Sequence, residues 1–270
     1  MGFYHDVGLV RVVFSTSVDV PLIGWSGSFV AKIVYDVFKS RGIVFKREMP
    51  KPFSISPLCV VKRGGEEIVW SGVCEKGVCR KSVVYSGRRY SFTIAFMDTS
   101  LVPKFIEGLQ EYNSYGFKPI EISYNCEKIG LRIKNPSTER IKAVIEIDYT
   151  TPTHYIHRSW EILYPSDKRL LYSLAKTLYN LTKINLKAYI ERVMAKGIEL
   201  LDQKTRIITV KIGEKKLVPA FIGKAKYGIY LKKYEYKILK ELLKIGETIG
   251  VGRNRALGFG KIKTKTLEEQ

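Results

Sequence analysis

The chain has 270 residues and a formal net charge of +20, with 46 Lys and Arg against 26 Asp and Glu. Hydrophobic residues make up 45% and aromatic residues 12%, which is enough apolar surface for a folded core and excludes a long disordered chain. No stretch approaches the roughly 18 uncharged apolar residues that a membrane-spanning helix needs, and Asp6 and Arg11 interrupt the apolar run of a signal peptide. We expect a cytoplasmic protein of one large or two small domains.

The excess of positive charge is the most informative bulk property. A folded surface with such an excess repels itself, and its partner is usually a polyanion. Nucleic acid is therefore the expected partner, with an inert basic surface as the alternative. An anionic membrane is disfavoured because no basic amphipathic tail or lipidation motif is present. The scarcity of Gln beside abundant Lys, Glu, Ile and Tyr is typical of thermophilic proteins.

Four cysteines are present, at positions 59, 74, 79 and 126. They are too few for a disulfide scaffold in a chain of this length. Cys74 and Cys79 lack a second nearby pair that would complete a tetrahedral zinc site. We therefore predict no metal and no other cofactor.

The first half of the chain alternates strand and helix patterns. A β-branched run at 8–18 predicts a strand, and 27–41 predicts a helix with Ser28 as a candidate N-cap and an end at Gly42. Three extended segments, a helix and an alternating strand are then expected, in that order, at 53–62, 67–71, 82–96, 100–112 and 120–134. The first two extended segments are expected to join across a turn at Gly64-Gly65, and 82–96 is expected to fold around a turn at Ser86-Gly87.

The second half repeats this order after the polar, proline-containing segment 135–138, which predicts domains at 1–135 and 136–270. A strand at 141–149 precedes a helix that opens at Pro165-Ser166-Asp167 and carries an apolar stripe of Leu170, Leu174, Leu178 and Leu181. A helical insertion, a hairpin about Gly213, a helix and a last strand are expected at 186–200, 205–227, 232–245 and 256–264. The order β-α-β-β-α-β occurs twice, which predicts an α+β fold of two tandem ferredoxin-like domains.

The strongest local signal is the glycine-rich segment 249–260, with Gly250, Gly252, Gly258 and Gly260 around Arg253 and Arg255. Glycines allow positive φ and close backbone approach to a ligand, while arginines supply charge for an anion. The segment fits neither a dinucleotide fingerprint nor a Walker motif, because arginine stands at 255 where either would need glycine. The alternative to an anion-binding loop is a flexible connector without a ligand.

With Phe259 before its last glycine, this segment resembles the glycine-rich loop of the RAMP proteins, and most of all the sixth CRISPR-associated family, an endoribonuclease that cuts repeat RNA. Three further segments are similar to that family: Val20-Pro21-x-x-Gly24, Tyr149-Thr150-Thr151-Pro152-Thr153 and Val218-Pro219-Ala220-Phe221-Ile222-Gly223. The resemblance implies two ferredoxin-like domains that bind precursor CRISPR RNA. It also implies metal-independent attack by the adjacent 2′-hydroxyl, which leaves a 2′,3′-cyclic phosphate and a 5′-hydroxyl.

The same resemblance implies catalytic positions on and after the first helix. Tyr35 matches the family's helix tyrosine and Lys51 its lysine before the next strand, whereas Phe45, Lys46 and Arg47 stand where the family has a histidine. We therefore expect Tyr35, Lys46 and Lys51 to act as proton donor and cations. The helical periodicity places Tyr35 away from the core, and a core aromatic is the alternative.

Several other residues are candidates for RNA contacts. Arg88-Arg89-Tyr90 at a hairpin tip and Lys224-Ala225-Lys226-Tyr227 after the second hairpin put cations beside rings that can stack on unpaired bases, although both could be solvated turns. The loop glycines, the loop arginines and Phe259 belong to the same predicted surface, as do Lys32 and Lys39 on the helix. His154 and His157 flank Tyr155 and could form an alternative acid–base site, whereas His5 lies in an N-terminus expected to be mobile.

Three functions remain open at this stage. The first is a CRISPR repeat-RNA endoribonuclease. The second is a non-catalytic RNA-binding RAMP protein that acts alone, as a homodimer or as a subunit with other CRISPR effector proteins. The third is a general RNA-binding or RNA-modifying protein of ferredoxin-like fold.

Overall fold

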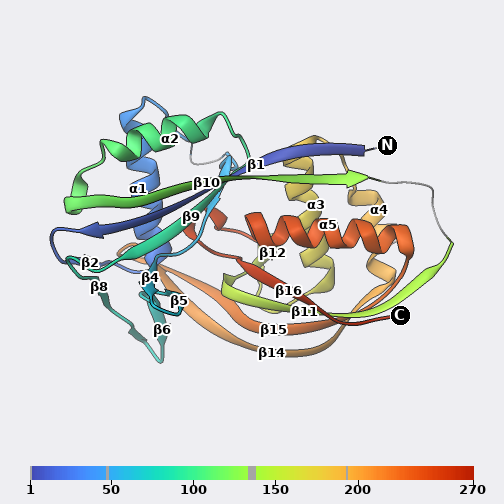
Figure 1. Ribbon diagram of the computed structural model, residues 1–270. Helices are drawn as coiled ribbons and strands as arrows, with labels where there is room; N and C mark the ends of the chain where they lie inside the picture. The colour runs from blue at the N-terminus through green and yellow to red at the C-terminus, as the bar shows by residue number, and fades with distance from the viewer. Residues whose placement is uncertain (1, 47–48, 133–137, 193) are drawn as a thin grey trace.

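The computed structural model describes all residues except 1, 47–48, 133–137 and 193 (Figure 1). Within these residues, the first six-stranded sheet is antiparallel and has the order β10-β1-β9-β4-β5, with β3 paired to β9. Its strands are β1 (Gly2–Thr16), β3 (Phe53–Ile55), β4 (Cys59–Lys62), β5 (Gly65–Ile68), β9 (Tyr90–Phe96) and β10 (Phe117–Arg132). Helices α1 (Ser26–Ser40) and α2 (Leu101–Gln110) pack on one face through a shared apolar core.

The second six-stranded sheet of the described chain is also antiparallel and has the order β16-β11-β15-β14-β6-β7. Its strands are β6 (Val73–Glu75), β7 (Val78–Cys79), β11 (Arg140–Thr153), β14 (Ile198–Ile212), β15 (Lys216–Lys232) and β16 (Ile262–Glu269). Its helices are α3 (Asp167–Thr182), α4 (Lys187–Arg192) and α5 (Lys233–Ile249). Two short ribbons pair β2 (Val20–Leu22) with β8 (Ser82–Val84), and β12 (Tyr155–His157) with β13 (Trp160–Ile162).

Both sheets contain the same four-strand arrangement. The central order β10-β1-β9-β4 and the order β16-β11-β15-β14 each place the fourth, first, third and second strands of a β-α-β-β-α-β unit side by side. The prediction of two tandem ferredoxin-like units in an α+β fold is confirmed. The predicted boundary at 135/136 lies outside the described residues.

Helix α3 shows how local sequence builds the second core. The Ser166 hydroxyl accepts a hydrogen bond from the Arg169 backbone N–H, so Ser166 caps the first turn. The predicted stripe then turns inward, because all four of its members are buried: Leu170, Leu174, Leu178 and Leu181. The start and the buried face of this helix were therefore both encoded locally.

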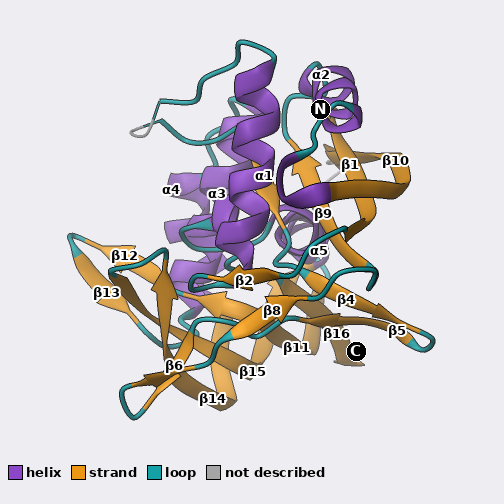
Figure 2. Ribbon diagram, turned by 90° about the vertical axis from the view of Figure 1, so that its left-hand side faces the viewer, coloured by secondary structure: helices purple, strands orange, loops and turns teal. Residues whose placement is uncertain are grey.

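The two units share a core. Helices α3 and α5 lie between the second sheet and the far ends of the long strands β1 and β10, as Figures 1 and 2 show. Val7, Ala95 and Ile129 of the first sheet belong to the same apolar cluster as the two helices. The Thr248 hydroxyl of α5 also donates to the Glu127 carboxylate of β10 at 2.8 Å. The first sheet is thus apolar on both faces where it meets the second unit.

A hairpin from the first half of the chain extends the second sheet. Strand β6 pairs with β14 through Val73 opposite Val210, and β7 pairs with β6. Cys74 and Cys79 lie opposite each other in this hairpin and form a disulfide. The cysteine pair therefore links two neighbouring strands. In the part of the chain that the structure describes, no group of three or more His, Cys, Asp or Glu side chains gathers to hold a metal.

Three predicted elements, and the expected mobility of the N-terminus, were wrong in detail. The segment 82–96 is not a hairpin, because β8 pairs with β2 while β9 pairs with β1. The insertion 186–200 is helical over Lys187–Arg192, but its last residues already belong to β14. The last strand begins at Ile262, since 255–257 form a 3-10 turn. His5 lies within β1, where its Nε2 contacts the Met97 carbonyl oxygen at 2.8 Å. None of the described helices is long and apolar enough to cross a membrane.

We expect the two units to unfold together, because Ile129 completes a core shared by both. Ile129→Ala should lower the free energy of unfolding by about 2–5 kcal/mol, the usual range for a buried large-to-small change. The measurement is urea unfolding followed by near-UV circular dichroism. Ile120→Ala on the same strand is the matched control, since Ile120 is 48% exposed; equal losses in the two variants would contradict the shared core.

Candidate functional site

The glycine-rich loop closes on itself through its backbone. The Val251 N–H donates to the Gly260 carbonyl at 2.8 Å, and the Gly260 N–H donates to the Pro152 carbonyl at 2.9 Å. Gly260 has φ of 73°, and a Cβ there would lie 1.8 Å from the Val251 carbonyl oxygen. No side chain fits this approach, so glycine at 260 is required by the closure of the loop.

One end of the loop contacts the start of α1. The Trp25 indole N–H donates to the Leu257 carbonyl at 2.7 Å. A Cβ at Gly27 would lie 2.1 Å from the same carbonyl oxygen, so the first turn of α1 touches the loop backbone. The loop therefore joins helix α1 of the first unit to α5 and β16 of the second.

The two loop arginines have opposite surroundings. The Arg255 side chain is half-buried, and its guanidinium donates to the Thr177 hydroxyl of α3 at 2.7 Å and to the Gly250 carbonyl at 3.4 Å. Burial lowers the pKa of Arg255 to about 10. Arg253 is exposed, and its backbone N–H donates to the His154 carbonyl at 3.2 Å. Of the two arginines predicted to contact RNA, Arg253 is accessible to a ligand from solvent, whereas Arg255 holds the loop to α3.

Sequence reasoning missed a second half-buried cation, Lys261. Its ammonium donates to the Thr248 carbonyl at 3.0 Å and lies 3.4 Å from the Ser54 hydroxyl of β3. Burial, followed by the nearby charge of Arg255, lowers the pKa of Lys261 to about 8. A lysine directly after the last loop glycine is the signal that could have drawn attention to it. Lys261 ties the loop to the first unit.

Phe259 was predicted to contact RNA, and this prediction is wrong. Its side chain is fully buried, with its ring centroid 6.0 Å from those of both Trp25 and His154. The ring fills the space beneath the loop and supports it. Tyr227, predicted to offer a ring beside two lysines, is buried as well, and its hydroxyl contacts that of Tyr149 at 2.8 Å.

His154 is a buried neutral histidine. It is 2% exposed, and its Nδ1 has no hydrogen-bond partner among the described residues. Burial, with smaller effects of Arg253 and Lys216, lowers the pKa of His154 to about 4. Its ring packs on Phe259 and is closed off from solvent. The alternative acid–base site is therefore reduced to His157.

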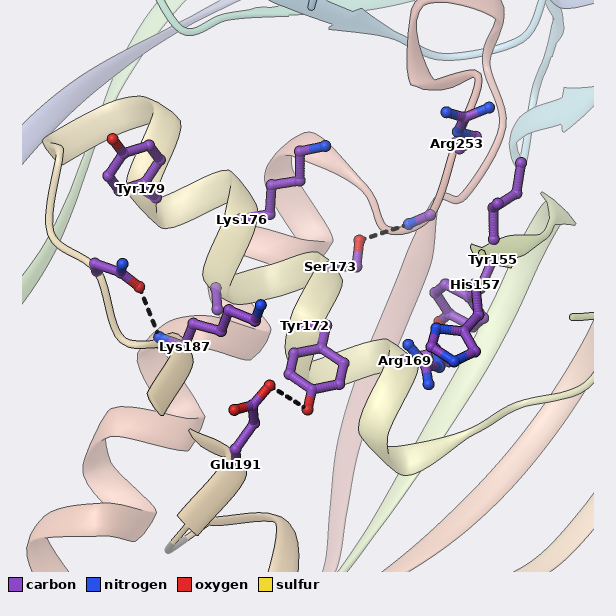
Figure 3. A pocket seen from close by; sticks show the side chains of 14 residues that line it. Tyr155, His157, Arg169, Tyr172, Ser173, Lys176, Tyr179, Lys187, Glu191 and Arg253 are labelled. Atoms are coloured by element: carbon purple, nitrogen blue, oxygen red, sulfur yellow. Dashed lines mark hydrogen bonds between the residues drawn. The ribbon is translucent and has the colours of Figure 1, made fainter. Parts of the chain in front are cut away.

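A hollow of about 630 Å³ lies beside the loop, between α3, α4 and β12 (Figure 3). The Gly252 N–H donates to the Ser173 hydroxyl of α3 at 2.7 Å, which fixes the loop as one wall. The hollow is lined by Tyr155, Ile156, His157, Arg169, Tyr172, Ser173, Ala175, Lys176, Tyr179, Asn185, Lys187, Glu191, Gly252 and Arg253. Four cations thus face a cavity with one carboxylate.

His157 sits at the rim of this hollow and is exposed. Partial desolvation, followed by the charges of Arg169 and Arg158, lowers the pKa of His157. His157 and Arg253 of the loop line the same hollow, which neither motif predicted.

The helix residue Tyr35 does not point away from the core as the periodicity indicated. Its ring is half-buried, with its centroid 6.1 Å from that of Phe45 and 5.8 Å from that of Phe53. Burial raises the pKa of Tyr35. A half-buried tyrosine that stays protonated can donate a proton, but it is a poor base.

The cations near Tyr35 differ in availability. The Lys51 ammonium donates to the carbonyls of Lys46 and Met49, so it ties down its own loop. The Lys46 side chain and Lys39 are exposed. Lys32 pairs with Asp36 at 3.0 Å and lies over the Tyr115 ring, and hydrogen bonds to Tyr115 and then to Asp36 raise the pKa of Lys32.

The remaining predicted RNA contacts are on strands and turns. Arg88 and Arg89 are exposed in the turn before β9, with Arg88 over the Tyr85 ring at 5.6 Å. Lys224 and Lys226 lie within β15, not after the hairpin, because β15 continues to Lys232. Lys224 pairs with Glu146 at 3.1 Å. These cations are on the surface and do not share a cavity with the loop.

The fold and the loop define a tandem ferredoxin-like protein with a glycine-rich loop between its units. Residues 147–262 match the family described as CRISPR-associated endoribonuclease Cas6. No curated protein sequence matches the chain. The matched segment contains the whole glycine-rich loop and covers less than half of the chain.

Solved structures support the fold over nearly the whole chain. A Cas6 product complex is similar with a TM-score of 0.64 and 11% identity over 96% of this chain and 99% of that chain. Thermus thermophilus Cas6 gives a TM-score of 0.60 and 13% identity over 96% and 98%. A partial complex titled Cas6-RT-Cas1 with Cas2 gives 0.61 and 13% over 98% of this chain and 47% of that chain.

The opposite surroundings of the loop arginines predict opposite effects of substitution. Arg255→Ala should lower the free energy of unfolding by about 1–3 kcal/mol, because buried hydrogen-bond partners lose their donor. Arg253→Ala should leave stability within about 0.5 kcal/mol, as surface changes usually do. Chemical denaturation of both variants checks this, and a larger loss in Arg253→Ala would show that the two roles are reversed.

His154 should make the protein less stable in acid. Its native pKa of about 4 lies below the ordinary 6.5, so between these values the unfolded chain binds a proton that the native chain does not. Stability is complete above pH 6.5 and falls as pH decreases toward 4, by at most about 3 kcal/mol from this group. Urea midpoints at pH 4–8 should lose part of this slope in His154→Leu and keep it in His157→Ala.

Proposed function

We propose that this protein is the endoribonuclease that cuts CRISPR repeat RNA in precursor crRNA. The supporting observation is that the Cas6 match at 147–262 contains the whole glycine-rich loop, which presents Arg253 to solvent beside a cationic hollow. The net charge of +20 fits a polyanionic substrate. An RNA strand bound along the loop would contact α1 at one end and α3 at the other.

The proposed reaction needs no metal ion. The 2′-hydroxyl attacks the adjacent phosphorus, the bond to the 5′-oxygen breaks, and the products carry a 2′,3′-cyclic phosphate and a 5′-hydroxyl. Tyr35, which its raised pKa keeps protonated, donates a proton to the leaving oxygen. Lys46 and Lys51 stabilise the charge on the pentacoordinate phosphorus, with a phosphate oxygen replacing a carbonyl partner of Lys51.

The proton of the 2′-hydroxyl passes to hydroxide from solvent in this scheme. The segment from Ser40 to Lys51 contains no histidine, and the raised pKa of Tyr35 makes it a poor acceptor. The cleavage rate should therefore rise with pH and lack the bell shape of a histidine pair.

A second candidate function is repeat-RNA binding without cleavage. It is favoured by the engagement of Lys51 with its own loop, which leaves the proposed centre without a free cation at that position. Such a protein would act as a homodimer or as a subunit beside other CRISPR proteins. Tight binding of repeat RNA with no cyclic-phosphate product would establish this alternative.

The decisive experiment is single-turnover cleavage of repeat RNA from the host's CRISPR array in EDTA. Product ending in 2′,3′-cyclic phosphate is expected from the wild-type chain. Tyr35→Phe, Lys46→Ala and Lys51→Ala should each reduce the rate about 10²-fold, the lower end for an acid–base group, with RNA affinity little changed.

Lys62→Ala is the matched control for the lysine variants. Lys62 lies at the end of β4, pairs with Glu67 of the neighbouring strand β5, and has no proposed role in cleavage, so this variant should cut at the wild-type rate. Wild-type rates in all three test variants, together with an inactive His157→Ala, would place the chemistry at the hollow instead of on α1.

A further inference from the structure

The hollow beside the glycine-rich loop has the composition of an anion site. Its cations are Arg169, Lys176, Lys187 and Arg253, and within the described residues none of them pairs with a carboxylate. The carboxylate in the wall, Glu191, accepts a hydrogen bond from the Tyr172 hydroxyl at 2.8 Å. The positive charge in the hollow is therefore left for a ligand.

The hollow also offers aromatic surface for a planar group. Tyr179 is 45% exposed at one end, where Figure 3 shows Lys176 and Lys187 between it and the loop. Arg169 lies over the Tyr172 ring at 5.4 Å, which holds the guanidinium at the other end. Exposed rings alternating with cations are typical of proteins that bind unpaired nucleotides.

The walls are held in place by contacts that do not involve the cations. The Gly252 N–H donates to Ser173 of α3, and a Cβ at Gly252 would lie 2.5 Å from the His154 carbonyl oxygen. The loop backbone is fixed on α3 while the side chain of Arg253 stays exposed. The volume of about 630 Å³ lies within the range of about 300–1,000 Å³ usual for small-ligand sites.

We propose that this hollow binds one unpaired nucleotide of a single-stranded RNA segment, with its phosphate at Arg169 and Arg253 and its base on Tyr179. The inference rests on the proposed function for the identity of the polymer, and it adds a subsite that lies across the loop from α1. Since Leu257 touches α1 and Gly252 lines the hollow, one loop joins the subsite to the proposed cleavage centre.

The test uses a 5′-labelled uridine octamer, which cannot form a hairpin, and fluorescence anisotropy at two salt concentrations. Arg169→Ala should weaken binding and flatten the plot of log K against log salt by about 0.7, the value for one phosphate contact on a single strand. Tyr179→Ala should weaken binding roughly 10-fold at both salt concentrations, within the range for one base–aromatic contact. Tyr179→Phe should bind as the wild type does.

Lys168→Ala is the matched control, because Lys168 precedes Arg169 on the same helix, is exposed and does not line the hollow. Lys176→Ala provides a second cation variant at an exposed position, should Arg169→Ala prove unstable. Equal salt slopes for Arg169→Ala, Lys176→Ala and Lys168→Ala would overturn the inference. So would a wild-type chain that does not bind the octamer, or equal affinity of Tyr179→Ala and wild type.

Cleavage of repeat RNA, measured in parallel, separates this inference from the proposed function. Loss of octamer binding in the hollow variants of a chain that cuts no repeat RNA would support the subsite and reject the nuclease. Normal octamer binding by the same variants of a chain that cuts repeat RNA would reject the subsite alone.

Discussion

The return of the glycine-rich loop onto its own backbone is the contact on which the rest of the site depends. Val251 and Gly260 approach so closely that neither unit could present the loop if a side chain stood at 260. The closed loop then has two outer surfaces, one against the first turn of α1 and one against α3. Because α1 belongs to the first unit and α3 to the second, the same closure sets the relative position of the two helices.

The cations of the glycine-rich loop fall into two groups: some stabilise the contacts between the loop and the two units, and others face solvent. Arg255 and Lys261 are half-buried, and among the described residues each is bound by hydroxyl or carbonyl oxygens and not by a carboxylate. These neutral oxygen partners leave the two positive charges without a counter-ion. Burial lowers the pKa of both groups, and the nearby charge of Arg255 lowers that of Lys261 further. An anionic strand near the loop would relieve that repulsion, so the structural cations favour the same ligand as Arg253 does.

Much of the fold could be predicted from the sequence, because periodicity and caps are local. The stripe and the Ser166 cap of α3 are of this kind. The pairing of β6 with β14 could not be predicted, since it joins a three-residue strand to a strand more than 130 residues away with no local signal. Tyr35 was misplaced for a related reason: a helical projection shows the face toward the sheet, whereas the chain after α1 folds back and covers a second face with Phe45.

The site was only partly predictable because the backbone conformation of one residue decides which of the two loop arginines points inward and which points to solvent. Asn254, which stands between Arg253 and Arg255, has φ of 59°, in the left-handed region. This turn reverses the direction of the chain, and so one arginine enters the protein while the other leaves it. A sequence pattern shows two equivalent cations, and it contains no information on which one the turn directs outward.

The cations that give the net charge of +20 differ in whether a carboxylate neutralises them, and this difference makes the hollow a stronger site for an anion than the second sheet. Cations on the second sheet are partly neutralised, as in the pairs of Arg206 with Glu75 and of Lys224 with Glu146. A hollow of about 630 Å³ is on the order of one Debye length across, about 8 Å at physiological salt. Its cations therefore act together on an anion inside it, whereas scattered surface cations are screened from one another. The arrangement of charge, more than its total, makes this surface suited to a polyanion.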